Sequence, residues 1–289
     1  MRERKREHVR KNHPVLILTI GFVLALCLIL YPVVSTIYNN YVESKLIVEY
    51  TQSVADIDNE LYEQLLEEAR AWNEELFGYI EPSYFPEGMT QNEIYESLLD
   101  PLGTGMMGYV VIPKIDVDLP IYHYSTDEVL EKGAGHMEAS ALPVGGESTH
   151  CVITAHRGLP GATMFTDLDK LEIGDVFYLK VLGEMLCYQI IEIQTVDPDE
   201  TASLLPEQGK DLCTLVTCTP YGINSQRLLV TGERIEIEEE EVETSDTGAI
   251  QKGINSNILL IIIAGAEVAC YATIMILMKK KKKKKKSIA

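Results

Sequence analysis

The stretch TLVTCTPYGINSQRLLVTGER, residues 214–234, indicates the fold most clearly, because it has two β-type runs on either side of a turn. The runs, residues 212–218 and 228–237, are rich in Leu, Val, Ile and Thr, which favour strands. Pro220 and Gly222 interrupt the pattern between them. The stretch therefore predicts a strand that ends at Cys218 and a second that begins near Arg227.

Five further β-type runs precede this pair, at residues 109–112, 119–122, 151–155, 176–181 and 185–195. Seven short strands within about 130 residues favour a barrel or a sandwich over a parallel α/β sheet. Short helices are predicted at residues 127–132 and 163–171. The expected fold of this region is mainly β.

A helix is predicted before the strands, over residues 52–78. Its apolar residues recur every three or four positions, with Asp and Glu on the opposite face: Ile57, Leu61, Leu65, Ala69, Trp72 and Leu76. Residues 79–104 contain three prolines and two glycines and are predicted to be an irregular connection.

The formal charge of -19 is unevenly distributed along the 289 residues. Residues 1–14 carry +4 and residues 279–286, all lysine, carry +8, so removing both from -19 leaves -31 for residues 15–278. An acidic middle argues against nucleic-acid binding, which needs basic patches, and 46% apolar content argues against a wholly disordered chain. The acidic run at 233–243 is interpreted as a solvated stalk, with a calcium site as the alternative.

Two apolar segments adjoin the basic ends. Residues 15–31, with their continuation past Pro32, and residues 258–278 are each long enough to cross a bilayer of about 30 Å at about 1.5 Å per residue. The positive-inside rule places both termini in the cytoplasm and the acidic middle outside. A cleaved signal peptide is the alternative for the first segment, but its apolar run exceeds the usual length of about 7 to 15 residues.

The candidate nucleophile is Cys218, because the turn after it would expose the thiol at a strand end. Cys27 and Cys270 lie in the apolar segments, and the remaining cysteines lie inside β-type runs as buried thiols or disulfide partners. A cysteine nucleophile needs a proton-transfer partner, and His156 also closes a predicted strand. Arg227 could stabilise a substrate carbonyl or a developing oxyanion. The other external histidines have weaker context and are predicted to be surface or structural: His123, His136 and His150.

Residue order excludes two cysteine chemistries. Phosphatases that cradle phosphate use C-x5-R, whereas Cys218 and Arg227 form C-x8-R. Papain-like proteases place the cysteine before the histidine, and here His156 precedes Cys218.

The stretch 214–234 and the stretch ITAHRGLPGATMFTDLDKLEIGD, residues 153–175, resemble the two signature blocks of sortases. GYVVIPKIDVDLPIYH, residues 108–123, resembles the opening strands of that family. The long N-terminal extension, the TPYGIN turn and the C-terminal apolar segment make the chain similar to class C, the pilus-building sortases. The resemblance covers about 130 residues.

The resemblance implies a closed eight-stranded β-barrel that cleaves an LPxTG-like sorting signal between Thr and Gly. Carried over to this chain, Cys218 forms a thioacyl intermediate, His156 is the general acid and base, and Arg227 stabilises the substrate and the oxyanion. A lysine amine of a pilin subunit is the expected acceptor. No cofactor and no metal are implied. Attachment of surface proteins to a cell-wall precursor, and a non-enzymatic scaffold held by both anchors, are the alternative functions.

These features predict seven successive segments in the membrane of a Gram-positive-type bacterium, with the catalytic domain outside. They are a cytoplasmic basic tail (1–14), a transmembrane helix or signal anchor (15–35), a helical extension with a possible lid (36–104), the sortase-type barrel (105–238), an acidic stalk (239–257), a second transmembrane helix (258–278) and a cytoplasmic polylysine tail (279–289).

One departure from class C concerns the lid, which in that class carries an Asp-Pro-aromatic motif. This chain has Asp100 and Pro101 followed by Leu102, or Glu81, Pro82 and Ser83 followed by Tyr84 and Phe85. Neither stretch reproduces the motif. The region of Tyr84 and Phe85 is the preferred lid candidate, with an ordinary linker as the alternative.

Overall fold

The computed structural model describes residues 13–77 and 93–236, with the short pieces 265–266, 269–270 and 273–274. The strands form a closed barrel in the order β1-β2-β3-β4-β7-β8-β6-β5, and β5 pairs with β1 to close it. Only β2–β3 and β4–β7 are parallel among these pairs. The strand bounds are Met106–Ile112 (β1), Val117–His123 (β2), Ala134–His136 (β3), Thr149–Thr154 (β4), Val176–Val181 (β5), Glu184–Val196 (β6), Asp211–Thr219 (β7) and Gln226–Ile235 (β8).

The predicted mainly-β barrel is confirmed, and each of the seven predicted runs overlaps one strand, although the runs 151–155 and 228–237 continue past the ends of β4 and β8. The run-based prediction missed β3, which is only three residues long and includes Gly135. Gly135 is required there, because a Cβ atom would overlap the carbonyl oxygen of Tyr124. A short strand of Ala, Gly and His has no apolar alternation by which the sequence could reveal it.

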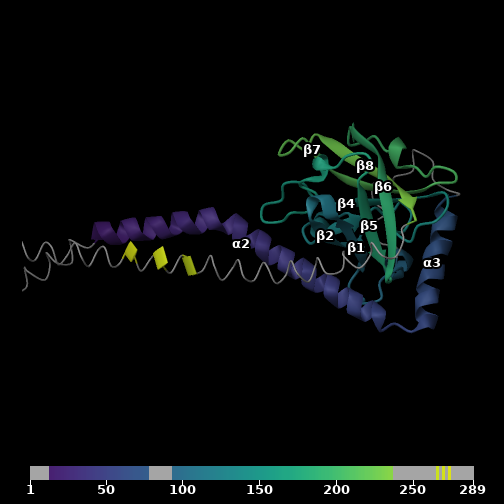
Figure 1. Ribbon diagram of the computed structural model, residues 1–289, viewed down its shortest axis with the longest axis horizontal. Coiled ribbons are helices and arrows are strands. Elements are labelled where there is room, and N and C mark those ends of the chain that lie inside the picture. The colour runs from purple at the N-terminus through teal and green to yellow at the C-terminus, as the bar shows by residue number, and fades with distance from the viewer. Residues whose placement is uncertain (1–12, 78–92, 237–264, 267–268, 271–272, 275–289) are drawn as a thin grey trace, which may run out of the picture.

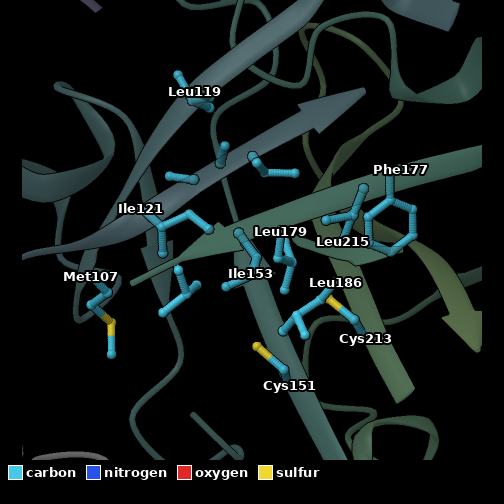
Figure 2. Close-up of a cluster of buried hydrophobic side chains, with 14 of the residues drawn as sticks. Met107, Leu119, Ile121, Cys151, Ile153, Phe177, Leu179, Leu186, Cys213 and Leu215 are labelled. Atoms are coloured by element: carbon cyan, nitrogen blue, oxygen red, sulfur yellow. The ribbon is translucent and has the colours of Figure 1, made fainter. Parts of the chain in front are cut away.

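The barrel interior is filled by apolar side chains from most of the strands. Figure 2 shows part of this core, including Ile121, Ile153, Leu179 and Leu215. A second, outer cluster joins Val216 of β7 to Val152, Leu204 and Leu229. Both faces of β7 are thus covered, and its residues from Leu212 to Thr217 are all buried.

Two long helices pack on the outside of the barrel. α2 (His13–Ala55) extends away from the barrel at its N-terminal half and crosses β1 and β2 at its C-terminal half (Figure 1). Ile47, Tyr50 and Val54 pack there against Met106, Tyr109 and Val111. The Tyr50 hydroxyl donates to the Met107 carbonyl at 2.8 Å and accepts from the Leu182 amide at 2.9 Å. α3 (Asn59–Phe77) buries Leu65, Leu66 and Ala69 in the main core.

The prediction of one helix over residues 52–78 is wrong at its start. α2 ends at Ala55 and α3 begins at Asn59, where the Asp58 carboxylate accepts the Leu61 amide at 2.9 Å. This is an N-cap, which begins a new helix. On the predicted face, Leu65 and Ala69 are buried but Leu61 is exposed.

The shorter helices agree partly with the sequence. α5 (Asp127–Leu130) confirms the helix predicted at 127–132, whereas the one predicted at 163–171 is reduced to the 3₁₀ turn η2 (Leu168–Lys170). α4 (Glu93–Ser97) lies in the stretch predicted as irregular. Two further 3₁₀ turns are η1 (Pro113–Ile115) and η3 (Ala202–Leu204).

Within the described residues, no single helix passes the length and apolarity criteria for crossing a bilayer. The segments Thr19–Leu28 and Leu30–Ala55, which meet at 42°, pass only when taken together. Pro32 lacks the N–H that would bond the Leu28 carbonyl, which explains a bend there. Most of the second predicted span (258–278) lies outside the described residues, as do the stalk (239–257) and the polylysine tail (279–289).

Candidate active site

Cys218 is the second-to-last residue of β7 and is partly exposed. The turn after it places the carbonyl of Pro220 3.0 Å from the amides of both Ile223 and Asn224. The buried run of β7 ends at Thr217, so the thiol lies where the strand leaves the core. This is the position that the turn signal in the sequence predicts.

The pairing of β4 with β7 continues past the end of the ladder, in the direction of His156 and Cys218. Within the ladder every residue of β4 pairs with the residue 62 positions later, from Thr149 and Asp211 to Thr154 and Val216. Beyond it, the Thr217 hydroxyl donates to the Ala155 carbonyl at 2.7 Å, again 62 positions apart.

The same offset recurs one step beyond the histidine. Arg157 Nη1 donates to Thr219 Oγ1 at 3.0 Å, also 62 positions away. His156 and Cys218, which share that offset, are thus enclosed between two hydrogen-bonded pairs. The sequence analysis missed Arg157 and Thr219, although each directly follows a predicted site residue.

Arg227 approaches Cys218 from the other neighbour of β7. The two residues are direct Cα partners in the antiparallel pairing of β7 with β8. The Arg227 guanidinium donates through Nη1 to the carbonyls of Gln226 at 3.1 Å and Asn224 at 3.4 Å. The structure therefore brings the three predicted site residues to one end of three adjacent strands.

The loop that follows His156 is packed against α2. Asn39 Nδ2 donates to the Gly161 carbonyl at 2.8 Å, and Gly161 lies directly against Ser35. Further along the loop, the Phe165 amide donates to the carbonyl of His156 at 3.0 Å. The Tyr221 ring lies over Gly158, where a Cβ atom would come within 2.7 Å of it. Helix, loop and nucleophile turn thus form one packed unit around His156.

His123, His136 and His150 are buried and hydrogen-bonded, which confirms a structural position. His136 Nδ1 lies 2.7 Å from the Tyr95 hydroxyl, and His150 Nε2 lies 2.7 Å from Thr214 Oγ1. Both ring nitrogens of His123 lie near carbonyls, those of Gly105 at 3.0 Å and Leu98 at 2.8 Å. Burial lowers the pKa of both His123 and His150, so the neutral ring is favoured.

Three further cysteines of the barrel strands are buried: Cys151, Cys187 and Cys213. Cys151 and Cys213 are Cα partners in the β4–β7 ladder, are buried, and lie among apolar side chains in Figure 2. Cys187 is also buried, and none of these three cysteines forms a disulfide. Burial raises the pKa of Cys213 well above its ordinary value, as expected for an unreactive thiol. Within residues 13–77 and 93–236, no group of three or more His, Cys, Asp or Glu side chains could hold a metal ion.

The lid candidates fall into two parts. Tyr84 and Phe85 lie outside the described residues. The Asp100 carboxylate accepts the amides of Thr104 and Gly105 at 2.9 Å each, so it shapes the turn that leads into β1. Pro101 lies in the same turn and is partly exposed.

Comparisons with known proteins agree with this geometry. The sortase domain family matches residues 110–235. The chain is similar to the crystal structure of sortase C1 from Streptococcus agalactiae, with 40% identity and a TM-score of 0.62, over 67% of this chain and 100% of that one. Sortase C from Streptococcus pneumoniae is 42% identical with a TM-score of 0.60, over 67% and 97%. Sortase C from Clostridium perfringens is 41% identical with a TM-score of 0.57, over 67% and 99%.

Curated relatives match over a shorter stretch. Sortase D from Bacillus subtilis (strain 168) is 32% identical over 131 residues, which are 44% of this chain and 63% of the relative. Sortase A from Bacillus anthracis is 27% identical over 130 residues, 45% of this chain and 60% of the relative. The chain thus spans less than two thirds of the length of these relatives.

Proposed function

The chain belongs to the sortase family of cysteine transpeptidases, and from this premise we propose that it joins pilin subunits in the manner of a class C enzyme. Its substrate in this proposal is an exported protein with an LPxTG-like sorting signal. Its acceptor is a lysine amine of another pilin subunit.

The proposed reaction has two acyl-transfer steps. The Cys218 thiolate attacks the carbonyl carbon of the signal's Thr, the Thr–Gly bond breaks, and His156 gives a proton to the departing Gly amine. The acceptor lysine amine then attacks the thioester and loses a proton to His156, and Cys218 leaves as the thiolate. Arg227 stabilises the oxyanion in both steps with its fixed charge and planar set of donors.

One observation carries this proposal: the constant offset of 62 residues between the ends of β4 and β7, which supports a position of His156 next to Cys218. Arg227 is the Cα partner of the same cysteine on β8. A nucleophile, a proton-transfer group and a cationic donor therefore converge from three adjacent strands. Effective acyl transfer requires this convergence, because proximity converts a bimolecular step into a unimolecular one.

The pilin substrate is proposed from similarity. The S. pneumoniae enzyme is described for its pilin substrate specificity, and an S. agalactiae sortase C1 belongs to a pilus island. The C. perfringens enzyme is described with a C-terminal cell-wall sorting motif. Identities of 41–42% to these proteins support the same substrate class for this chain.

We place the enzyme in the membrane of a Gram-positive-type bacterium, with both termini in the cytoplasm. The basic ends next to the apolar segments 15–31 and 258–278 support this orientation. Enzyme and substrate would share one membrane, which raises their effective concentration without new contacts. Tyr84 and Phe85, or else Asp100 and Pro101, would form any lid.

The test uses the full chain in detergent micelles, an LPxTG-type peptide and candidate pilins. Mass spectrometry should find the acyl group on Cys218, and the amine that releases it identifies the acceptor. A lysine amine supports pilin joining, whereas release only by a cell-wall precursor amine assigns the wall-anchoring alternative. If Cys218→Ala still joins the proteins, the covalent mechanism is wrong and the scaffold alternative gains.

A further inference from the structure

Arg157, the residue after His156, has a largely buried side chain whose guanidinium makes three polar contacts. Its side chain is only 7% exposed. Nη1 donates to Thr219 Oγ1 at 3.0 Å, Nε donates to the Thr166 carbonyl at 3.2 Å, and Nη2 pairs with Asp169 Oδ2 at 2.5 Å. One side chain thus connects the end of β4, the end of β7 and the stretch from Thr166 into η2.

We propose that Arg157 is a positioning residue that sets the separation of His156 and Cys218. The inference rests on the proposed function and deepens it. Arg157 and Thr219 directly follow the two reacting residues, so their hydrogen bond fixes the backbone on the C-terminal side of both. The Thr217 hydroxyl and the Ala155 carbonyl fix the opposite side.

The chemistry of the contact explains why arginine suits this position. The three acceptors lie on two segments, the end of β7 and the stretch that leads into η2. A planar guanidinium reaches them with N–H groups in a fixed arrangement that the single ammonium of lysine lacks. Asp169, whose side chain is 49% exposed, balances the charge from the solvent side. Removing Asp169 alone would leave a nearly buried cation partly uncompensated.

The two arginines at this site therefore have different tasks. β7 lies between β4 and β8 in the barrel, so Arg157 acts from the histidine side and Arg227 from the other. The Arg157 guanidinium contacts Thr219, Thr166 and Asp169. The Arg227 guanidinium donates to the carbonyls of Asn224 and Gln226. Loss of Arg157 should therefore affect the alignment of the reacting groups rather than substrate binding.

The test compares four variants of the full chain in detergent micelles: Arg157→Met, Arg157→Lys, Thr219→Val and the control Lys114→Met. The control removes ion pairs of 2.7 and 2.8 Å, to Glu172 and Asp175, elsewhere on the barrel. Circular dichroism establishes folding. Thr219→Val keeps the side-chain shape and removes only the acceptor, so it tests the contact even if Arg157→Met does not fold.

We expect Arg157→Met to lower kcat for peptide transpeptidation about 100-fold, as a misplacement of about 1 Å can do, with KM nearly unchanged. Thr219→Val should lower kcat about tenfold, and Arg157→Lys should lie between wild type and Arg157→Met. A fifth variant, Arg157→Met combined with Thr219→Val, should lose less kcat than the product of the two single losses, since both substitutions remove one contact. Lys114→Met should match wild type.

A second readout does not need turnover. The rate of Cys218 alkylation by iodoacetamide is followed against pH by peptide mass spectrometry, which separates it from the exposed Cys27 and Cys270. The reactivity of a thiol depends on the groups around it, so both Arg157→Met and Thr219→Val should change the profile, and in the same way. Unchanged profiles in both folded variants would overturn the inference. An inactive wild type whose profile still shifts in the variants would refute the proposed function and leave the positioning role supported.

Discussion

Cys218 stands directly opposite Arg227 in the antiparallel pairing of β7 with β8. The Arg227 guanidinium donates to the carbonyl of Asn224, in the six-residue turn between the strands, and to that of Gln226, the first residue of β8. Because both strands belong to a closed barrel, the backbones of the two residues have little freedom to move apart. The position of Arg227 is thus a property of the sheet rather than of a mobile loop.

Replacing Arg227 by lysine keeps the charge but removes the planar set of donors. We expect Arg227→Lys to lower kcat/KM by at least about tenfold, because an oxyanion needs donors in fixed directions. Peptide transpeptidation by the folded variant measures the loss. Arg234→Lys, at the other end of the same strand, is the control and should retain activity. Equal activity of Arg227→Lys and wild type would remove Arg227 from the proposed mechanism.

The sequence predicted the strand ends at Cys218 and Arg227 well because a short turn determines which residues meet. The neighbouring relation of His156 to Cys218 could not be derived from local patterns, since β4 and β7 are parallel and 62 positions apart. That both residues close a predicted strand allowed a shared barrel end, and the family resemblance linked them. Periodicity carries no information about which distant strands pair, and a long-range pairing appears only when the barrel closes.

Helix boundaries were predicted less well for a different reason. The apolar period continues through the end of α2 into α3, so the break is marked only by the N-cap at Asp58. The contacts of Arg157 were equally hidden, because Thr166 and Asp169 lie on a segment predicted as a regular helix. In the structure, only Leu168–Lys170 of that segment is a 3₁₀ turn, and its irregular backbone turns the Thr166 carbonyl toward the guanidinium.

The contact of α2 with the loop after His156 should matter for activity. Gly161→Ala would place a methyl group in the Ser35 side chain and weaken the bond from Asn39. We expect slower transpeptidation and faster amide hydrogen exchange across residues 158–165, because the loop loses its support from the helix.

Gly174→Ala provides the matched control for that variant. Gly161 and Gly174 have similar positive φ values, +85° and +96°, so both substitutions cost about 1–2 kcal/mol of backbone strain. Gly174 has open space around it, and its substitution should leave the loop unchanged. Equal effects of the two variants on exchange and activity would mean that backbone strain, not the contact with α2, is responsible.

A buried hydrogen bond attaches α4 to the barrel. The Tyr95 hydroxyl lies 2.7 Å from His136 Nδ1, and both residues are fully buried. Tyr95→Phe leaves that nitrogen without its partner and should lower the free energy of unfolding by about 1–3 kcal/mol. Denaturant unfolding measures the change. Tyr124→Phe removes an exposed bond to Glu96 at 3.1 Å and should cost less than about 0.5 kcal/mol. Equal costs would contradict this account.

Stability should fall on mild acidification because of two buried histidines. Burial lowers the pKa of both His123 and His150, and their carbonyl hydrogen bonds oppose this only in part. The unfolded chain therefore binds these protons near the ordinary histidine pKa of about 6.5, where the folded chain does not. The free energy of unfolding keeps its full value above that pH and decreases below it, toward the lowered pKa values of the folded state. The slope is up to about 1.4 kcal/mol per pH unit for each proton.

Denaturant unfolding of the full chain between pH 5.5 and 7.5, a window chosen from the ordinary histidine pKa of about 6.5, measures this slope. His123→Gln keeps a donor for one of the carbonyls but cannot titrate, so it should be less stable at neutral pH and show a smaller slope. The half-buried Asp211 acts in the opposite direction, because burial raises its pKa and the folded chain then binds the proton more readily. Asp211→Asn should therefore leave the slope unchanged or make it steeper. If His123→Gln retained the wild-type slope while Asp211→Asn reduced it, the acid sensitivity would come from the carboxylate and not from the histidines.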